Sequence, residues 1–118
     1  MADKDELGRR GEAVAARWLE AAGCDVVDRN WRCPAGELDL VLRAGATTVF
    51  VEVKTRSSLA FGHPFEAITP AKQARLRRLA AEWCRENGPV PGDIRIDAVA
   101  VLDAWSAEPV VEHLAGVA

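Results

Sequence analysis

The segment GELDLVLRAGATTVFVEVKTR, residues 36–56, contains two runs of apolar residues that are typical of β-strands, and both runs also carry charged side chains. Side chains of a strand alternate between its two faces, so each run is expected to have one apolar face and one mixed face. The apolar faces hold Leu38, Leu40 and Leu42 in the first run and Val49, Val51 and Val53 in the second. The mixed faces hold Glu37, Asp39 and Val41 in the first run and Phe50, Glu52, Lys54 and Arg56 in the second.

The sequence AGAT between the two runs fits a hairpin with a two-residue loop at residues 45–46. The register that follows places Asp39 opposite Glu52 and Glu37 opposite Lys54. A slip by one residue would mix the apolar and charged faces, which a buried core resists. Directly opposed Cβ atoms lie about 4.5–5.5 Å apart. Two ionised carboxylates at that spacing require a proton, a basic group or a metal ion to offset their repulsion.

Asp39, Glu52 and Lys54 together have the composition of a site for metal-assisted phosphodiester hydrolysis. Mg²⁺ prefers oxygen ligands and is often held by one or two carboxylates together with phosphate and water. Such an ion lowers the pKa of a bound water and neutralises charge that develops on the phosphate. Lys54 could then hold a water or a phosphate oxygen. The alternative is an ordinary cross-strand cluster of ion pairs that includes Glu37.

The remainder of the chain predicts an α/β fold with the element order α-β-β-β-α-β-β. Residues 5–22 have helical periodicity and many alanines, and Gly23 is expected to end this helix. A strand is expected near residues 24–32. Thr69 and Pro70 predict the start of a second helix, which follows an irregular connection at residues 57–68 and runs to about Arg85. Its expected core residues are Leu76, Leu79, Ala80 and Trp83. Two further strands are expected at residues 93–102 and 109–114.

Length and composition limit the classes of protein to which the chain can belong. A chain of 118 residues with 49% hydrophobic content suggests a single domain with one core. No apolar run approaches the ~20 residues that span a bilayer, and the N-terminal MADKDELGRRGE lacks the apolar centre of a secretory signal. The three cysteines have neither disulfide-framework nor zinc-site spacing. We therefore expect a cytoplasmic protein with reduced thiols and no membrane partner.

The net charge of −3 weighs against an anionic partner, but the charge is divided along the chain. Residues 54–85 contain seven basic and two acidic residues, whereas residues 86–118 contain one basic and six acidic residues. The basic segment predicts a local positive face that contacts nucleic-acid phosphates. The residues expected there are Arg56, Lys72, Gln73, Arg75, Arg77 and Arg78, with Lys72 and Gln73 best placed to reach the carboxylates. The alternative is a solvent-exposed helix surface.

Three other residues are expected to have structural roles. Trp31 is expected to pack in a core, although its neighbours Arg29 and Arg32 would also suit stacking on a base. His63 is expected to stabilise the loop after the second run of the hairpin. Asp97 is expected at the edge or the end of a strand.

Six segments in a fixed order resemble one known family. They are GRRGEAVAARWLEAAG, RNWRC, GELDLV, FVEVKTR, FGHPFEAI and RIDAVAV. This set is similar to the YraN family of bacterial predicted endonucleases, and the spacing from Asp39 to Glu52-Val53-Lys54 is that of the PD-(D/E)xK nuclease superfamily. The proline–aspartate pair that names the superfamily is absent, because Asp39 follows Leu38.

The resemblance implies a restriction-endonuclease-like fold, with an αβββαβ core and a mixed sheet flanked by helices, as in archaeal Holliday-junction resolvases. It also implies site roles. Asp39, Glu52 and the main-chain carbonyl of Val53 would bind Mg²⁺ or Mn²⁺, Lys54 would orient the attacking water, and Glu12 in the first helix would complete the site. Three small residues surround Glu12 at helical spacing and would allow close approach to the sheet or to nucleic acid: Gly8, Gly11 and Ala15.

The sequence therefore predicts a metal-dependent endonuclease that acts on DNA. Branched or single-stranded DNA is the preferred substrate by analogy with the resolvases, because nothing in the sequence suggests base-specific readout. A homodimer is expected if the substrate is a symmetric junction. Two alternatives stay open: a non-catalytic nucleic-acid-binding module of the same fold, and an interaction protein without a nucleic-acid role.

Overall fold

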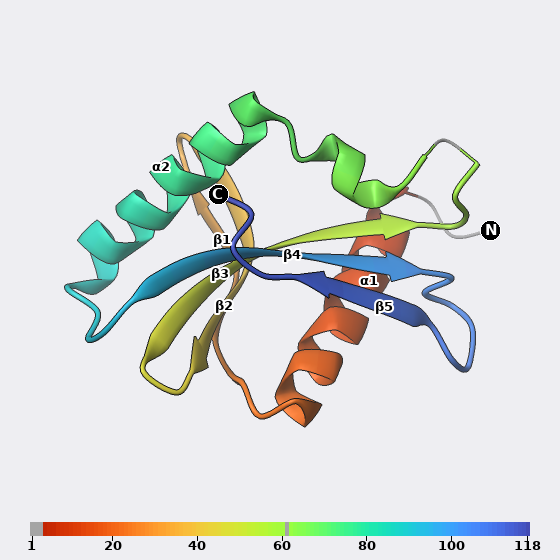
Figure 1. The fold of residues 1–118 in the computed structure, drawn as a ribbon, viewed down its shortest axis with the longest axis horizontal. Helices are drawn as coiled ribbons and strands as arrows, with labels where there is room; N and C mark the ends of the chain where they lie inside the picture. The colour runs from red at the N-terminus through yellow and green to blue at the C-terminus, as the bar shows by residue number, and fades with distance from the viewer. Residues whose placement is uncertain (1–3, 61) are drawn as a thin grey trace.

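The computed structural model describes residues 4–60 and 62–118, and it contains a five-stranded sheet with a long helix on each face (Figure 1). Residues 1–3 and residue 61, the first of FGHPFEAI, lie outside the described ranges. The elements are α1 (Lys4–Ala21), β1 (Asp25–Cys33), β2 (Gly36–Ala44), β3 (Thr47–Arg56), the short 3₁₀ helix η1 (Pro64–Ala67), α2 (Pro70–Asn87), β4 (Ile94–Leu102) and β5 (Val110–Leu114). The predicted element order is confirmed, and η1 is an addition to it.

The strands lie side by side in chain order, and the sheet is mixed. β2 is antiparallel to both β1 and β3, and β5 is antiparallel to β4. β3 and β4 are parallel, and α2 forms the crossover between them. This confirms the predicted α/β class, and the arrangement is consistent with a restriction-endonuclease-like core. In the described ranges, neither long helix has the length and apolar character of a membrane span.

Local sequence signals explain where the elements begin and end. The side chain of Thr69 accepts a hydrogen bond from the backbone N–H of Lys72 at 3.2 Å, and Pro70 follows at the first helical position of α2. Gly23, with φ of 100°, follows α1. The β2–β3 loop has Gly45 at φ 62°, as a type II′ hairpin turn requires at its first central position. The predicted two-residue loop is confirmed by the pairing across it.

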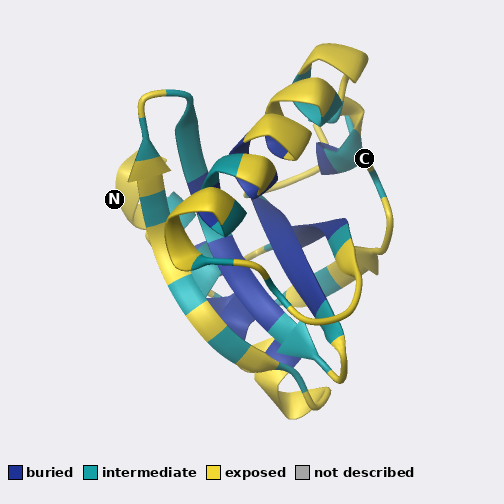
Figure 2. Ribbon diagram, turned by 90° about the vertical axis from the view of Figure 1, so that its left-hand side faces the viewer, coloured by how far each residue is buried: buried dark blue, intermediate teal, exposed yellow. Residues whose placement is uncertain are grey.

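Two apolar cores cover the two faces of the sheet. The α1 core contains Val14, Ala15, Ala16, Leu19, Leu40, Leu42, Val49, Val51, Val53, Val99, Val101 and Ala104. The α2 core contains Leu38, Val41, Phe50, Leu76, Leu79, Ala80, Trp83 and Ile96, which confirms the predicted buried face of α2. Figure 2 shows buried segments in dark blue along the central strands and on the side of α2 that faces the sheet.

The predicted face of Leu38 is wrong. Leu38 packs in the α2 core with Val41, whereas Leu40 packs in the α1 core. Regular alternation would place residues 38 and 40 on the same face. The β2–β3 pairing ends at Leu40 and Val51, so the beginning of β2 is no longer held in register with β3. The change of face occurs at the point where the two strands separate.

Asp97 is fully buried within β4, so its predicted position at an edge or strand end is also wrong. Its carboxylate accepts hydrogen bonds from Arg95 at 2.8 and 2.9 Å and from the backbone N–H of Gly116 at 3.0 Å, and it lies 2.7 Å from Nε2 of His113. Burial alone would raise the pKa of Asp97, but these bonds and the charge of Arg95 hold it below its usual value.

Replacing Asp97 with alanine should lower the free energy of unfolding by about 2–4 kcal/mol at pH 7, because it leaves the groups around it without their buried acceptor. A carboxylate with a lowered folded-state pKa stabilises the fold above its unfolded pKa, and this contribution is lost as the pH falls through the folded value. The difference in the free energy of unfolding between wild type and Asp97→Ala should therefore become smaller at acidic pH. Urea unfolding measures this difference. Asp93→Ala is the control, because Asp93 is exposed. Equal midpoints for Asp97→Ala and wild type would contradict the prediction.

Candidate metal and nucleic-acid site

The candidate site lies where β2 and β3 separate. Five cross-strand pairs, from Ala44–Thr47 to Leu40–Val51, have the predicted register. The ladder ends there, before the predicted pairs Asp39–Glu52 and Glu37–Lys54. Oδ2 of Asp39 accepts a hydrogen bond from the backbone N–H of Val53 at 2.7 Å. This side chain therefore connects the two strands just beyond their last paired residues.

Three carboxylates from two elements meet beside this bond. Glu12 of α1 and Glu37 and Asp39 of β2 each place an oxygen within 4.8 Å of the others, and all three residues are half-buried. We call these residues the carboxylate cluster. Asn30 of β1 lies next to it at a φ of 50°. With its amide nitrogen turned toward the cluster, Asn30 donates to Glu12 at 2.8 Å and to Glu37 at 3.0 Å.

The carboxylate cluster holds negative charge in a poorly hydrated place. Burial and, after it, the charges of Glu52, Glu12 and Glu37 together raise the pKa of Asp39 to about 7, against the opposing hydrogen bond from Val53. Burial also raises the pKa of Glu12, with smaller contributions from Glu37 and Glu52. A divalent cation would relieve this repulsion and favour the ionised carboxylates.

Glu52 is buried and is held by two lysines. Its Oε1 lies 3.4 Å from Nζ of Lys54 and 3.0 Å from Nζ of Lys72, which comes from the first turn of α2. The expected pairing of Glu37 with Lys54 is wrong, because Glu37 instead pairs with Arg32 at 3.3 Å. Glu52 is not a member of the carboxylate cluster, although its charge is the largest electrostatic influence on Asp39.

The donor set of the carboxylate cluster fits a hard divalent cation. Its three members offer oxygen ligands, as Mg²⁺ and Mn²⁺ prefer, and their oxygens are close enough to share one ion. The ligand roles of Asp39, Glu52 and the Val53 carbonyl stay predictions. The structure adds Glu37, which the sequence analysis treated as an ion-pair partner. Its position two residues before Asp39, on the same face of a strand, was the available signal.

Close contact between α1 and β3 sets the position of Glu12. A Cβ built on Gly11 would overlap Oγ1 of Thr55 and lie 2.7 Å from its Cβ. No such restriction applies at Gly8, where an added Cβ would meet no other part of the described chain within 4 Å, apart from the neighbouring turns of its own helix. Of the small residues expected to allow close approach, Gly11 is the one on which the packing of helix and strand depends.

The predicted nucleic-acid-binding residues of α2 divide between two sides of the helix. Lys72 reaches Glu52, and the guanidinium of Arg75 lies against the β1–β2 turn, where a Cβ on Gly36 would approach it to 2.6 Å. Gln73 and Arg77 line two separate pockets that also contain residues of the C-terminal segment 114–118. Residues that are one or two positions apart in sequence do not share a helix face.

The other two predicted nucleic-acid-binding residues lie at different places. Arg78 is exposed on α2. Arg56 is half-buried at the end of β3, and its carbonyl accepts a hydrogen bond from Asp103 at 3.2 Å. The six predicted residues therefore do not form one continuous surface, and their role in binding stays a prediction.

Two expected structural roles are confirmed. Trp31 is half-buried against the α2 core, and its Nε1 donates to Glu86 at 2.7 Å. His63 stabilises the connection after β3, because its Nδ1 accepts from the N–H of Phe65 at 3.1 Å and its Nε2 lies 2.8 Å from Glu112.

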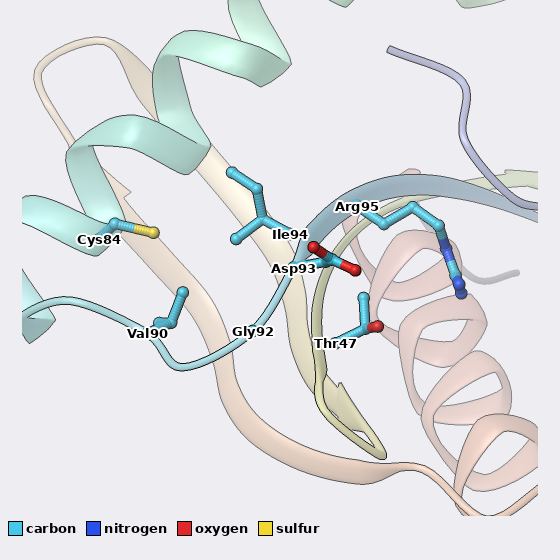
Figure 3. Close-up of a pocket in the computed structure, with 7 residues that line it drawn as sticks. All are labelled: Thr47, Cys84, Val90, Gly92, Asp93, Ile94 and Arg95. Carbon is cyan, nitrogen blue, oxygen red and sulfur yellow. The ribbon is translucent and has the colours of Figure 1, made fainter.

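A pocket of about 760 Å³ lies away from the carboxylate cluster, between the end of α2 and the start of β4 (Figure 3). It is lined by Thr47, Cys84, Val90, Gly92, Asp93, Ile94 and Arg95. Burial raises the pKa of the Cys84 thiol, which disfavours the reactive thiolate. Arg95 is already bonded to Asp97. The convergent charged groups of the described residues lie at the separation of β2 and β3, so we place the candidate site there.

The mixed sheet, the flanking helices and the carboxylate cluster define an α/β protein with an architecture consistent with a restriction-endonuclease-like core. The chain belongs to the UPF0102 family: the model described as "Uncharacterised protein family UPF0102" matches residues 11–101. This range includes the carboxylate cluster, Glu52 and both lysines. The expected relationship to the YraN proteins is confirmed at the level of this family, and the PD-(D/E)xK assignment stays a prediction.

Curated relatives match the chain over nearly its full length. A UPF0102 protein of Leifsonia xyli subsp. xyli and one of Beutenbergia cavernae are each 63% identical over 117 residues, which cover 99% of both chains. A UPF0102 protein of Streptomyces griseus subsp. griseus is 53% identical over 118 residues, again with 99% of both chains covered. These names state the family and no activity.

Proposed function

We propose that this UPF0102 protein is a divalent-metal-dependent nuclease that hydrolyses phosphodiester bonds of DNA. The observation that carries the proposal is the carboxylate cluster, whose oxygens lie within 4.8 Å of one another. The hydrogen bond from Val53 to Asp39 connects this cluster to the strand that bears Glu52 and Lys54. Carboxylates that could share a cation, beside a strand that carries a lysine, suit the metal-assisted hydrolysis of a phosphodiester.

The proposal gives each residue a role. Glu12, Glu37 and Asp39 would hold Mg²⁺ or Mn²⁺, and the ion would supply Lewis acidity and a water of lowered pKa. Lys54 would donate a hydrogen bond to the attacking water or to a phosphate oxygen. Lys72 lies 3.0 Å from Glu52 and would keep this buried carboxylate in one orientation.

The finer proposals concern the substrate and the assembly. Branched or single-stranded DNA is the preferred substrate, which rests on the resemblance to Holliday-junction resolvases. A homodimer would suit a symmetric junction, because a two-fold assembly presents two equivalent sites.

The test is the cleavage of linear, flapped and four-way DNA by the purified protein with Mg²⁺ or Mn²⁺. We expect cleavage with either ion, none with EDTA, and a loss of about 10²-fold in rate for Lys54→Ala, the scale of one proton-transferring or charge-stabilising group. Arg43→Gln, at the opposite end of β2, is the control and should cleave at the wild-type rate. Absence of cleavage on every substrate with both ions would reject the nuclease, and DNA binding without cleavage would favour the non-catalytic module.

A further inference from the structure

A pocket of about 560 Å³ opens between the first half of α1 and the β1–β2 turn. Its lining carries three basic and three acidic side chains: Lys4, Arg9, Arg32, Asp5, Glu12 and Glu37. Glu12 and Glu37 are also members of the carboxylate cluster. The pocket and the candidate metal site therefore share a wall, and a ligand in the pocket would lie next to a bound cation.

Two arginines of this pocket present hydrogen-bond donors to solvent. Arg32 pairs with Glu37 through Nε at 3.3 Å, but its side chain is 79% exposed. Arg9 is exposed, and its charge acts on Glu12, whose pKa it lowers. A guanidinium carries five N–H donors in a planar fork that matches the oxygens of a phosphate. Each arginine thus has donors available for an anion.

The charge balance of the pocket depends on a cation. Asp39 lies behind the shared wall, so four carboxylates act against three basic side chains when no metal is bound. This slight excess of negative charge does not attract a phosphodiester. One divalent cation at the carboxylate cluster changes the balance by two units and makes it positive. Attraction of a phosphate should therefore require the ion.

The basic residues of α2 are less suited to this role. Lys72 is engaged by the buried Glu52, and Arg77 faces a pocket that contains Ala118. Arg9 and Arg32 line the pocket that shares a wall with the cluster. Arg29 lines a smaller pocket that also contains Glu12, but it pairs with Glu20 at 3.7 Å. This differs from the sequence-based expectation that the second helix supplies the phosphate contacts.

We infer that the pocket between α1 and the β1–β2 turn binds a backbone phosphate of a DNA strand beside the metal ion, with Arg9 and Arg32 as its direct ligands. The inference rests on the proposed function and deepens it. Among the described residues, those that line the pocket include no aromatic side chain on which a base could stack. Binding here is therefore cation-dependent and reads the backbone instead of the bases.

Fluorescence anisotropy of a labelled oligothymidylate tests the inference, in Ca²⁺ and in EDTA. Ca²⁺ is chosen because it takes the same oxygen ligands. Wild type should bind about tenfold more tightly in Ca²⁺. Arg9→Gln and Arg32→Gln should each remove most of this gain and lower the salt slope by about 0.7, the value for one phosphate contact on a single strand. Arg17→Gln, an equal charge change on an exposed position of the same helix, should retain the wild-type affinity.

Equal affinity in Ca²⁺ and EDTA would overturn the inference, and so would equal losses in Arg9→Gln and Arg17→Gln. A rise in Tm with Mn²⁺, retained in the arginine variants, shows that folding and metal binding are intact. If the oligothymidylate binds as expected but no DNA is ever cleaved, the proposed nuclease activity is rejected and the phosphate site is supported. If DNA is cut while Arg9→Gln and Arg32→Gln bind like wild type, the phosphate site fails and the nuclease stands.

Discussion

Replacing Asp39 with asparagine should abolish DNA cleavage and, at the same time, make the metal-free protein more stable. Burial and the charge of Glu52 raise the pKa of Asp39 from 3.8 to about 7. For an acid with a raised folded-state pKa, the stabilising contribution is complete below the unfolded pKa and is lost as the pH rises through the folded value. Asparagine has no charge to desolvate and can still accept the hydrogen bond from Val53.

We expect Asp39→Asn to gain about 1–3 kcal/mol in the free energy of unfolding at pH 8, and much less at pH 4. Urea unfolding in EDTA at both pH values measures the gain. Mg²⁺ or Mn²⁺ should raise the Tm of wild type at pH 8 and leave that of the variant unchanged, because a ligand of the ion is lost. The cleavage rate should fall by at least about 10²–10³-fold, the scale for loss of one preorganised electrostatic group.

Asp25→Asn is the matched control, because Asp25 is exposed at the start of β1 and lies outside the cluster. It should show neither the gain in stability nor the loss of cleavage. An Asp39→Asn protein that is less stable than wild type at both pH values, or that keeps its response to metal, would contradict the assignment of Asp39 to a metal site.

Replacing Gly11 with alanine should strongly destabilise the fold. Alanine is favoured over glycine within a helix by about 0.5–1 kcal/mol. At Gly11, however, the new methyl group would overlap the side chain of Thr55. Rotation about χ1 moves Oγ1, but Cβ, 2.7 Å from the new methyl group, cannot move without shifting β3. The steric cost exceeds the helical preference, and we expect a net loss of about 2–3 kcal/mol in the free energy of unfolding. Urea unfolding followed by circular dichroism measures this loss.

Gly8→Ala, on the same helix, is a control that should change the free energy of unfolding in the opposite direction. An added Cβ at Gly8 has open space, so helical preference alone should stabilise this variant by about 0.5–1 kcal/mol. The double variant Gly11→Ala, Thr55→Gly removes the overlapping atoms and should recover part of the stability lost in Gly11→Ala. If Gly11→Ala is as stable as Gly8→Ala, the close contact between α1 and β3 does not exist in solution.

The sequence by itself determined the features that depend on neighbouring residues. The two-residue loop at Gly45 and the cap at Thr69 are local signals, and both are found where they were expected. The buried stripe of α2 follows from helical periodicity, and the cross-strand register near the hairpin follows from its loop. Such features need no knowledge of distant parts of the chain, because turn geometry and side-chain alternation set them.

Only the tertiary structure decided where β2 leaves β3. Beyond Leu40, β2 stays paired with β1 but no longer with β3, and Leu38 there packs in the α2 core instead of on the face that alternation predicts. The same separation brought Glu37 into the carboxylate cluster instead of opposite Lys54.

The partners of buried charges were likewise decided in three dimensions. Arg95 lies two residues from Asp97 on the same face of β4, but no local pattern predicts that His113 of β5 and Gly116 beyond it also reach this carboxylate. The position of Glu12 depends on the contact between Gly11 and Thr55, which are distant in sequence. The residue types of the candidate site can be found in the sequence. Their grouping follows from the packing of helices against strands, because that packing must minimise voids and uncompensated charge in the whole molecule.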